Sequence, residues 1–148
     1  MKNQIATLAL AVLFVALSAA QAKAQDKCSN RTTTGKYVVV CDGFLTPAPN
    51  APLVPAKELA LAVGDSSGTF TATGTISVGG TILKATVKGT QQLNPDCTGT
   101  ITYQQTINGQ PGPPLDITFV VSQDGDTVDG LVTDPGAVFA CKLTRTKD

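Results

Sequence analysis

The stretch LKATVKGTQQLNPDCTGTITYQQTI, residues 83 to 107, contains two alternating runs on either side of one turn. Before the turn, small or apolar residues at every second position from Leu83 to Gly89 alternate with lysine and threonine. After it, Ile101 and Tyr103 alternate with threonine and glutamine. A period of two is typical of a β-strand that buries one face and exposes the other. The stretch therefore predicts two strands joined by a turn.

The turn itself is Asn94-Pro95-Asp96-Cys97-Thr98-Gly99-Thr100. Asn-Pro and Asp followed by Thr-Gly are turn-forming combinations. A cysteine in such a turn is well placed to tether it to another element, and a free, small apolar side chain is the alternative.

The same alternation continues on both sides of this stretch. It predicts six further strands over residues 36–44, 58–63, 69–78, 115–121, 127–133 and 137–144. Gly79-Gly80 fits a two-residue hairpin turn. Residues 45–55 contain four prolines and predict an irregular loop that covers or crosses one end. Residues 108–114, rich in Gly and Pro, predict a second loop.

Eight strands with mostly short connections favour an all-β fold, an eight-stranded antiparallel up-and-down barrel, because neighbours in sequence usually pair. A β-sandwich is the alternative. A barrel requires the first and eighth strands to be neighbours. Cys41 shares a face with Tyr37, and Cys141 shares a face with Phe139, so a disulfide between these cysteines fits the closure. Cys28 and Cys97 would then form the second bridge, although four cysteines allow three pairings.

The face assignment predicts an apolar interior. On the third to sixth strands no charged residue points inward, which argues against acid–base catalysis there. Branched aliphatic residues dominate, which favours a filled core over a hollow one. Small residues such as Ala72 and Gly74 make an apolar pocket the alternative. The aromatic candidates to line a ligand site are Tyr37, Phe70, Tyr103 and Phe119. The full inward set is Tyr37, Val39, Leu59, Leu61, Val63, Phe70, Ile76, Leu83, Val87, Ile101, Tyr103, Ile117, Phe119, Val121, Phe139 and Leu143.

The N-terminus predicts export. Lys2 precedes an apolar run from residue 5 to 20, and Ala22-Lys23-Ala24 fits a signal-peptidase site. We therefore expect a signal peptide over residues 1–24 and a single barrel domain over residues 25–148, with an uncleaved anchor as the alternative. The expected location is secreted or periplasmic, where disulfides persist.

Composition excludes several classes of partner. Removing Lys2 and Lys23 from a chain with equal numbers of acidic and basic residues leaves a net charge of −2. The chain has no basic stretch of the kind that binds nucleic acid or an anionic membrane surface. The mature chain contains no predicted membrane span. No cofactor is expected.

Three site motifs are weak. The four cysteines are widely spaced and the chain has no histidine, which disfavours zinc. Gly64-Asp65-Ser66-Ser67-Gly68 matches the hydrolase nucleophile motif, but a strand follows it and a histidine base is absent, so we interpret it as a turn. Asp124, Asp126 and Asp129 fit a calcium loop poorly, so they are interpreted as turn residues.

The chain resembles a group of small exported bacterial proteins of unassigned function. The resemblance rests on Cys28, on Gly35-Lys36-Tyr37 and on Asp96-Cys97-Thr98-Gly99-Thr100, together with Ala62-Val63-Gly64, Phe119-Val120-Val121, Asp124-Gly125 and Thr133-Asp134-Pro135-Gly136. Gln91 stands where such proteins usually have tyrosine, and Cys41 with Cys141 are additions. The resemblance implies a calycin-like (lipocalin-like) or allene-oxide-cyclase-like barrel and brings no catalytic residues.

These observations predict a secreted, non-catalytic β-barrel module that binds a small apolar ligand or a surface partner. A cyclase- or isomerase-like barrel enzyme and a structural envelope or matrix protein are the alternatives.

Overall fold

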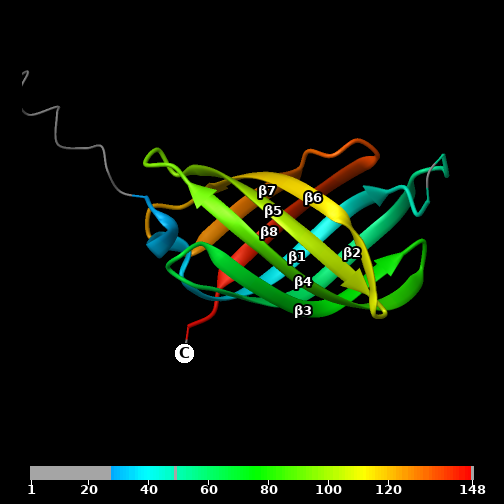
Figure 1. Ribbon diagram of the computed structural model, residues 1–148, viewed down its shortest axis with the longest axis horizontal. Helices are drawn as coiled ribbons and strands as arrows, with labels where there is room; N and C mark the ends of the chain where they lie inside the picture. The colour runs from blue at the N-terminus through cyan, green and yellow to red at the C-terminus, as the bar shows by residue number, and fades with distance from the viewer. Residues whose placement is uncertain (1–27, 49, 148) are drawn as a thin grey trace, which may run out of the picture.

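The computed structural model describes residues 28–48 and 50–147, so the expected signal peptide lies outside the described residues. In this part of the chain a short 3-10 helix precedes eight strands, which close into one barrel in the order of the sequence (Figure 1). The 3-10 helix η2 spans Asn30–Thr33. The strands are β1 (Gly35–Leu45), β2 (Val54–Gly64), β3 (Thr69–Val78), β4 (Thr81–Leu93), β5 (Thr98–Ile107), β6 (Gln110–Val121), β7 (Thr127–Val132) and β8 (Ala137–Arg145).

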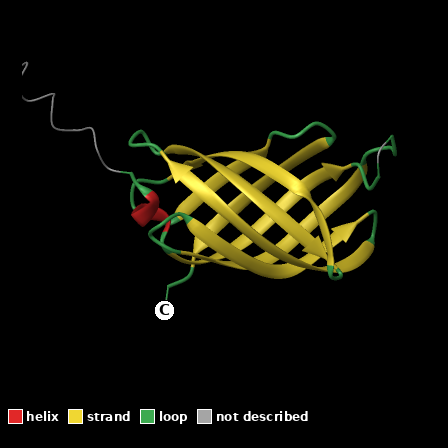
Figure 2. Ribbon diagram, in the orientation of Figure 1, coloured by secondary structure: helices red, strands yellow, loops and turns green. Residues whose placement is uncertain are grey.

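Strands β1 and β8 close the barrel. They pair antiparallel from Tyr37 with Arg145 to Leu45 with Ala137, and each pair of strands that follow one another in the sequence is also antiparallel. Closure removes the exposed sheet edges of an open meander. The predicted eight-stranded up-and-down barrel is confirmed, and the strands wind around one axis with the turns gathered at the two ends (Figure 2).

Two hairpins owe their tight turns to residues that accept a positive φ. Gly79 and Gly80 join β3 to β4 with φ of 57° and 88°. Asn108 and Gly109 join β5 to β6 with φ of 49° and 82°. Two successive residues with positive φ form the hairpin turn whose twist matches that of paired strands, and Asn-Gly is its strongest sequence signal.

The long loop predicted over residues 108–114 is therefore wrong, because β6 begins directly after this turn, at Gln110. The early part of β6 includes Pro111 and pairs with β5 across a register shift, whereas its pairing with β7 begins only at Ile117. Proline has no backbone N–H, so a strand tolerates it where no neighbouring strand on one side needs that hydrogen bond. Similarly, β1 and β2 pair as far as Leu45 and Val54, so both strands extend into the range predicted as a loop.

The predicted inward face of β2 is also wrong. Leu59, Leu61 and Val63 point outward, with 62%, 47% and 47% of their surface exposed. Ala60 and Ala62 are buried instead. The register with β1, which places Tyr37 opposite Ala62, fixes this choice, and a one-residue change in register would reverse every side chain.

Part of the interior is densely filled. Phe119 and Ile76 each retain 1% of their surface. The Phe119 ring lies over Gly99, its register partner on β5, and a Cβ built on Gly99 would come within 2.4 Å of that ring. Glycine at position 99 therefore makes room for the largest fully buried side chain of the barrel.

A candidate ligand cavity inside the barrel

The interior of the barrel contains a partly open cavity of about 90 Å³. The predicted filled core is thus wrong for one region of the interior, which remains hollow. Every strand contributes to the wall, and Thr33 of η2 contributes from one end. Most of the wall is apolar: Val39, Ala60, Ala62, Ala72, Val87, Ile101, Ile117, Val128 and Leu143.

The hollow region follows from small side chains on two adjacent strands. Ala60 and Ala62 of β2 lie beside Gly74 and Ala72 of β3 in the sheet register. A Cβ on Gly74 would come within 2.2 Å of the Leu59 carbonyl oxygen, so only glycine fits at that close approach. Because β2 directs alanines inward and its larger aliphatic residues outward, this side of the wall leaves volume unfilled.

Three of the four aromatic candidates lie on the cavity wall. They are Tyr37 of β1, Phe70 of β3 and Tyr103 of β5. Phe119 is not part of the wall, because its ring is packed against Gly99. The four candidates therefore do not form one site.

Sequence reasoning missed Glu58, which points into the cavity from β2. Its register partners are Cys41 and Ile76, both buried. The side-chain amide of Gln105, itself 8% exposed, donates a hydrogen bond to Glu58 Oε2 at 3.2 Å. The alternation Glu58, Ala60, Ala62 was the available signal, but the neighbouring leucines favoured the opposite face.

Burial raises the pKa of the Glu58 carboxyl, and the hydrogen bond from Gln105 lowers it by less. Removing an ionised carboxylate from water is costly, so a buried carboxyl holds its proton to a higher pH. The interior thus contains an ionisable group on β2, whereas the sequence predicted an absence of inward charge for the third to sixth strands.

Tyr103 of β5 brings a second ionisable side chain to the cavity wall, close enough to Glu58 to be affected by its charge. Burial, the Glu58 charge and the Asp134 charge, in that order, raise the pKa of its hydroxyl, which stays protonated. None of the described residues forms a hydrogen bond with the Tyr103 hydroxyl. The hydroxyl oxygen retains some accessible surface. Since Tyr103 lines the cavity, this hydroxyl is available to an occupant.

The Cys41–Cys141 disulfide forms another part of the wall. The two cysteines are register partners on β1 and β8, with their Cα atoms 4.0 Å apart. The second disulfide joins Cys28 to Cys97. Both pairings agree with the predicted ones.

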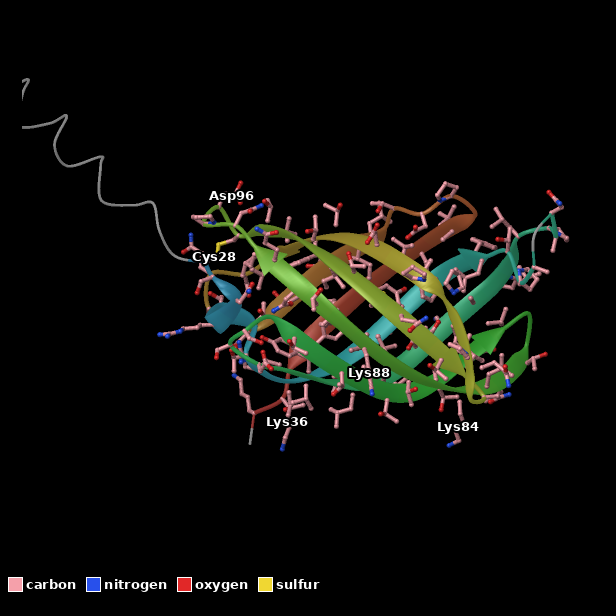
Figure 3. The ribbon with its side chains drawn as sticks, in the orientation of Figure 1. Cys28, Lys36, Lys84, Lys88 and Asp96 are labelled. Carbon is pink, nitrogen blue, oxygen red and sulfur yellow. A yellow bond between two sulfur atoms is a disulfide. The ribbon has the colours of Figure 1, made fainter. Side chains whose placement is uncertain are left out.

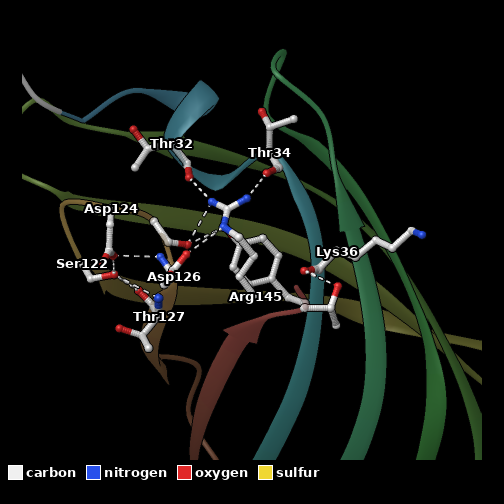
Figure 4. A network of polar contacts seen from close by, with 11 residues as sticks. Thr32, Thr34, Lys36, Ser122, Asp124, Asp126, Thr127 and Arg145 are labelled. Atoms are coloured by element: carbon white, nitrogen blue, oxygen red, sulfur yellow. Dashed lines mark hydrogen bonds and ion pairs between the residues drawn. The ribbon is translucent and has the colours of Figure 1, made fainter. Parts of the chain in front are cut away.

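Arg145 fastens one end of the barrel (Figure 4). Its guanidinium donates to the carbonyl oxygens of Thr34 and of Thr32, the latter at 2.6 Å, and to that of Gly125 at 3.0 Å. It also forms an ion pair with Asp126 at 3.3 Å. One side chain thus joins the segment around η2, the β6–β7 turn and the end of β8.

Tyr37 belongs to this same end. The Arg145 guanidinium carbon lies 4.9 Å from the centre of the Tyr37 ring, which is the geometry of a cation–π contact. The Tyr37 hydroxyl donates to the Gly125 carbonyl oxygen at 2.7 Å. Its polar atom is therefore engaged by the protein, and Tyr37 offers the cavity its ring.

The segment around η2 is fixed to the turns beside it. The Leu93 amide donates to Asn30 Oδ1 at 3.1 Å, and the Gln91 side chain donates to Thr33 Oγ1. The disulfide from Cys28 reaches the β4–β5 turn, where Asp96 also lies (Figure 3). Lysine side chains, by contrast, extend from the outside of the barrel, as Lys84 and Lys88 do in Figure 3.

The weaker motifs form turns. Asp65 accepts hydrogen bonds from the amides of Ser67 and Thr69, at 2.8 and 3.1 Å. Asp124 accepts one from the Asp126 amide at 3.0 Å. Across residues 28–48 and 50–147, no three histidine, cysteine, aspartate or glutamate residues gather as a metal site. No helix within that part of the chain is long and apolar enough to span a membrane.

Comparisons with family models, with curated proteins and with solved structures found no match. The closed barrel is compatible with the calycin-like architecture that the resemblance implies. Membership of the exported bacterial group remains a prediction.

Proposed function

We propose that the protein is a non-catalytic module that binds a small apolar ligand inside its barrel. One observation carries the proposal: a cavity of about 90 Å³ whose wall is largely aliphatic and aromatic. Apolar cavities bind small apolar molecules because burying the apolar surface of the ligand is favourable.

The rigid surroundings favour binding over a packing defect. The disulfide Cys41–Cys141 lies in the wall, and Arg145 fastens one end through three carbonyl groups and one carboxylate. A preorganised cavity loses little conformational entropy when a ligand enters.

We further propose that the protein acts outside the cytoplasm, after cleavage following Ala24. Two disulfides in a small domain fit an oxidising compartment. The intact mass of the secreted protein tests this, because a mass that retains residues 1–24 contradicts it.

Xenon under pressure, followed by methyl NMR, tests the binding function with an apolar probe. We expect saturable shifts at the cavity methyls of Val39, Val87 and Leu143. The exposed methyls of Leu61 and Val63 serve as the internal control and should stay unchanged. Equal, non-saturating shifts at both sets of methyls would contradict binding in the interior.

A second candidate, a cyclase- or isomerase-like enzyme, rests on Glu58. A partly buried carboxyl with a raised pKa is a feature of acid–base sites. In this case Glu58→Gln would abolish turnover and leave binding of the apolar body intact, whereas in a binding module there is no turnover to lose.

A further inference from the structure

The charge of the cavity wall has one sign. Among the described residues that line the cavity, Glu58 is the one carboxylate, and none is a lysine or an arginine. The other titratable wall groups are the hydroxyls of Tyr37 and Tyr103, since both wall cysteines are in a disulfide. An ionised Glu58 therefore gives the cavity a negative charge that no described wall residue balances.

The remaining wall is suited to a cation with an apolar body. Tyr37, Phe70 and Tyr103 supply three aromatic rings, and the faces of such rings attract ammonium groups. Folding removes part of the Glu58 side chain from water, so an entering cation meets a carboxylate that is more weakly hydrated than one on the surface.

Hydrogen-bonding capacity points the same way. Glu58 Oε2 accepts from Gln105, whereas no described residue donates to Oε1. The Tyr103 oxygen likewise retains its lone pairs. An ammonium group carries three donors and no acceptor, so it can donate to both open acceptors.

We propose that the ligand is a small alkylamine, bound as its ammonium ion with the nitrogen at Glu58 and Tyr103. The proposal rests on the apolar-ligand function and specifies the chemical class of the ligand. A cavity of roughly 150 Å³ holds benzene, so about 90 Å³ holds an apolar body of on the order of four non-hydrogen atoms.

The test compares isobutylamine with isobutanol, which has the same carbon skeleton and no charge, by calorimetry on the disulfide-bonded protein. Above the pKa of Glu58 we expect the amine to bind about tenfold or more tightly than the alcohol, the effect of one hydrogen bond between charged groups. Equal affinities would overturn the proposal.

Two variants separate the carboxylate from general charge. Glu58→Gln should remove the preference for the amine while isobutanol binding persists. Asp42→Asn removes an exposed acid from the outer face of β1 and should keep the preference. A preference that survives Glu58→Gln would overturn the proposal.

A pH series on the unmodified protein gives the same answer without relying on a variant. As pH falls through the Glu58 pKa, the affinity for isobutylamine should fall, because protonation removes the negative charge. Isobutanol affinity should stay constant. In that pH range, amine binding should also release a proton, seen as a dependence of the binding heat on the buffer.

The two proposals fail on different results. If xenon and isobutanol both fail to bind, the apolar-ligand function is contradicted. If both bind and the protein does not prefer isobutylamine to isobutanol, only the alkylamine proposal is contradicted.

Discussion

Glu58 is the residue at which sequence pattern and structure diverge most. Both faces of β2 are mainly apolar, so the period of two predicts a strand without deciding which face is buried. Transfer free energy alone favours burying Leu59 and Leu61 over Ala60 and Ala62. The alanines face the interior instead, because closure of the whole barrel sets the register of β2 with β1 and β3. That constraint lies outside any local pattern.

The raised pKa of Glu58 predicts how stability depends on pH. The folded state holds this proton more tightly than the unfolded state, whose pKa is near the ordinary value of 4.5. The stabilising contribution of the protonated carboxyl is therefore complete below 4.5 and lost as pH rises through the folded-state pKa. Above it, Glu58 is a partly buried charge that destabilises the fold.

Glu58→Gln should accordingly be more stable than the natural protein at pH 8, and this advantage should shrink toward pH 4. Urea unfolding at the two pH values measures it, with Asp42→Asn as the control for the loss of one acid. A stability difference that does not change with pH would show that Glu58 has an ordinary pKa.

At the scale of elements, local turn chemistry and strand period were informative. The bounds of β3 and the Gly79-Gly80 turn follow from the sequence, because a strict alternation ends at two glycines. The start of β6 was missed, since Pro111 outweighed the Asn108-Gly109 hairpin signal. The closure of β1 on β8 was predictable because it places Cys41 beside Cys141.

Each disulfide should stabilise the fold by about 2–4 kcal/mol, mainly by restricting the unfolded chain. The bridges span 69 and 100 residues, so in that model their contributions are similar. We expect Cys28→Ala with Cys97→Ala, and Cys41→Ala with Cys141→Ala, each to lower the free energy of unfolding in urea by this amount. A loss below about 0.5 kcal/mol for either pair would contradict a structural role for that bridge.

At the scale of the whole molecule, the barrel is filled around Ile76 and Phe119 and hollow beside Ala60, Ala62 and Ala72. Composition could not predict this division, because the volume left inside depends on how all inward side chains pack together. The apolar wall and three of its aromatic residues were foreseeable from period two. The carboxyl at Glu58 and the location of the void were not.

The central claim is that the barrel is hollow at Ala72, and one pair of leucine substitutions tests it most directly. Ala72 lines the cavity, whereas Ala85 is 2% exposed on β4 and is not part of the cavity wall. Urea unfolding should show Ala85→Leu destabilised by about 1–3 kcal/mol through overpacking. Ala72→Leu should leave stability unchanged or raise it by up to about 2 kcal/mol, because its added carbons enter empty apolar space. If Ala72→Leu is destabilised as much as Ala85→Leu, the interior is filled and the account is contradicted.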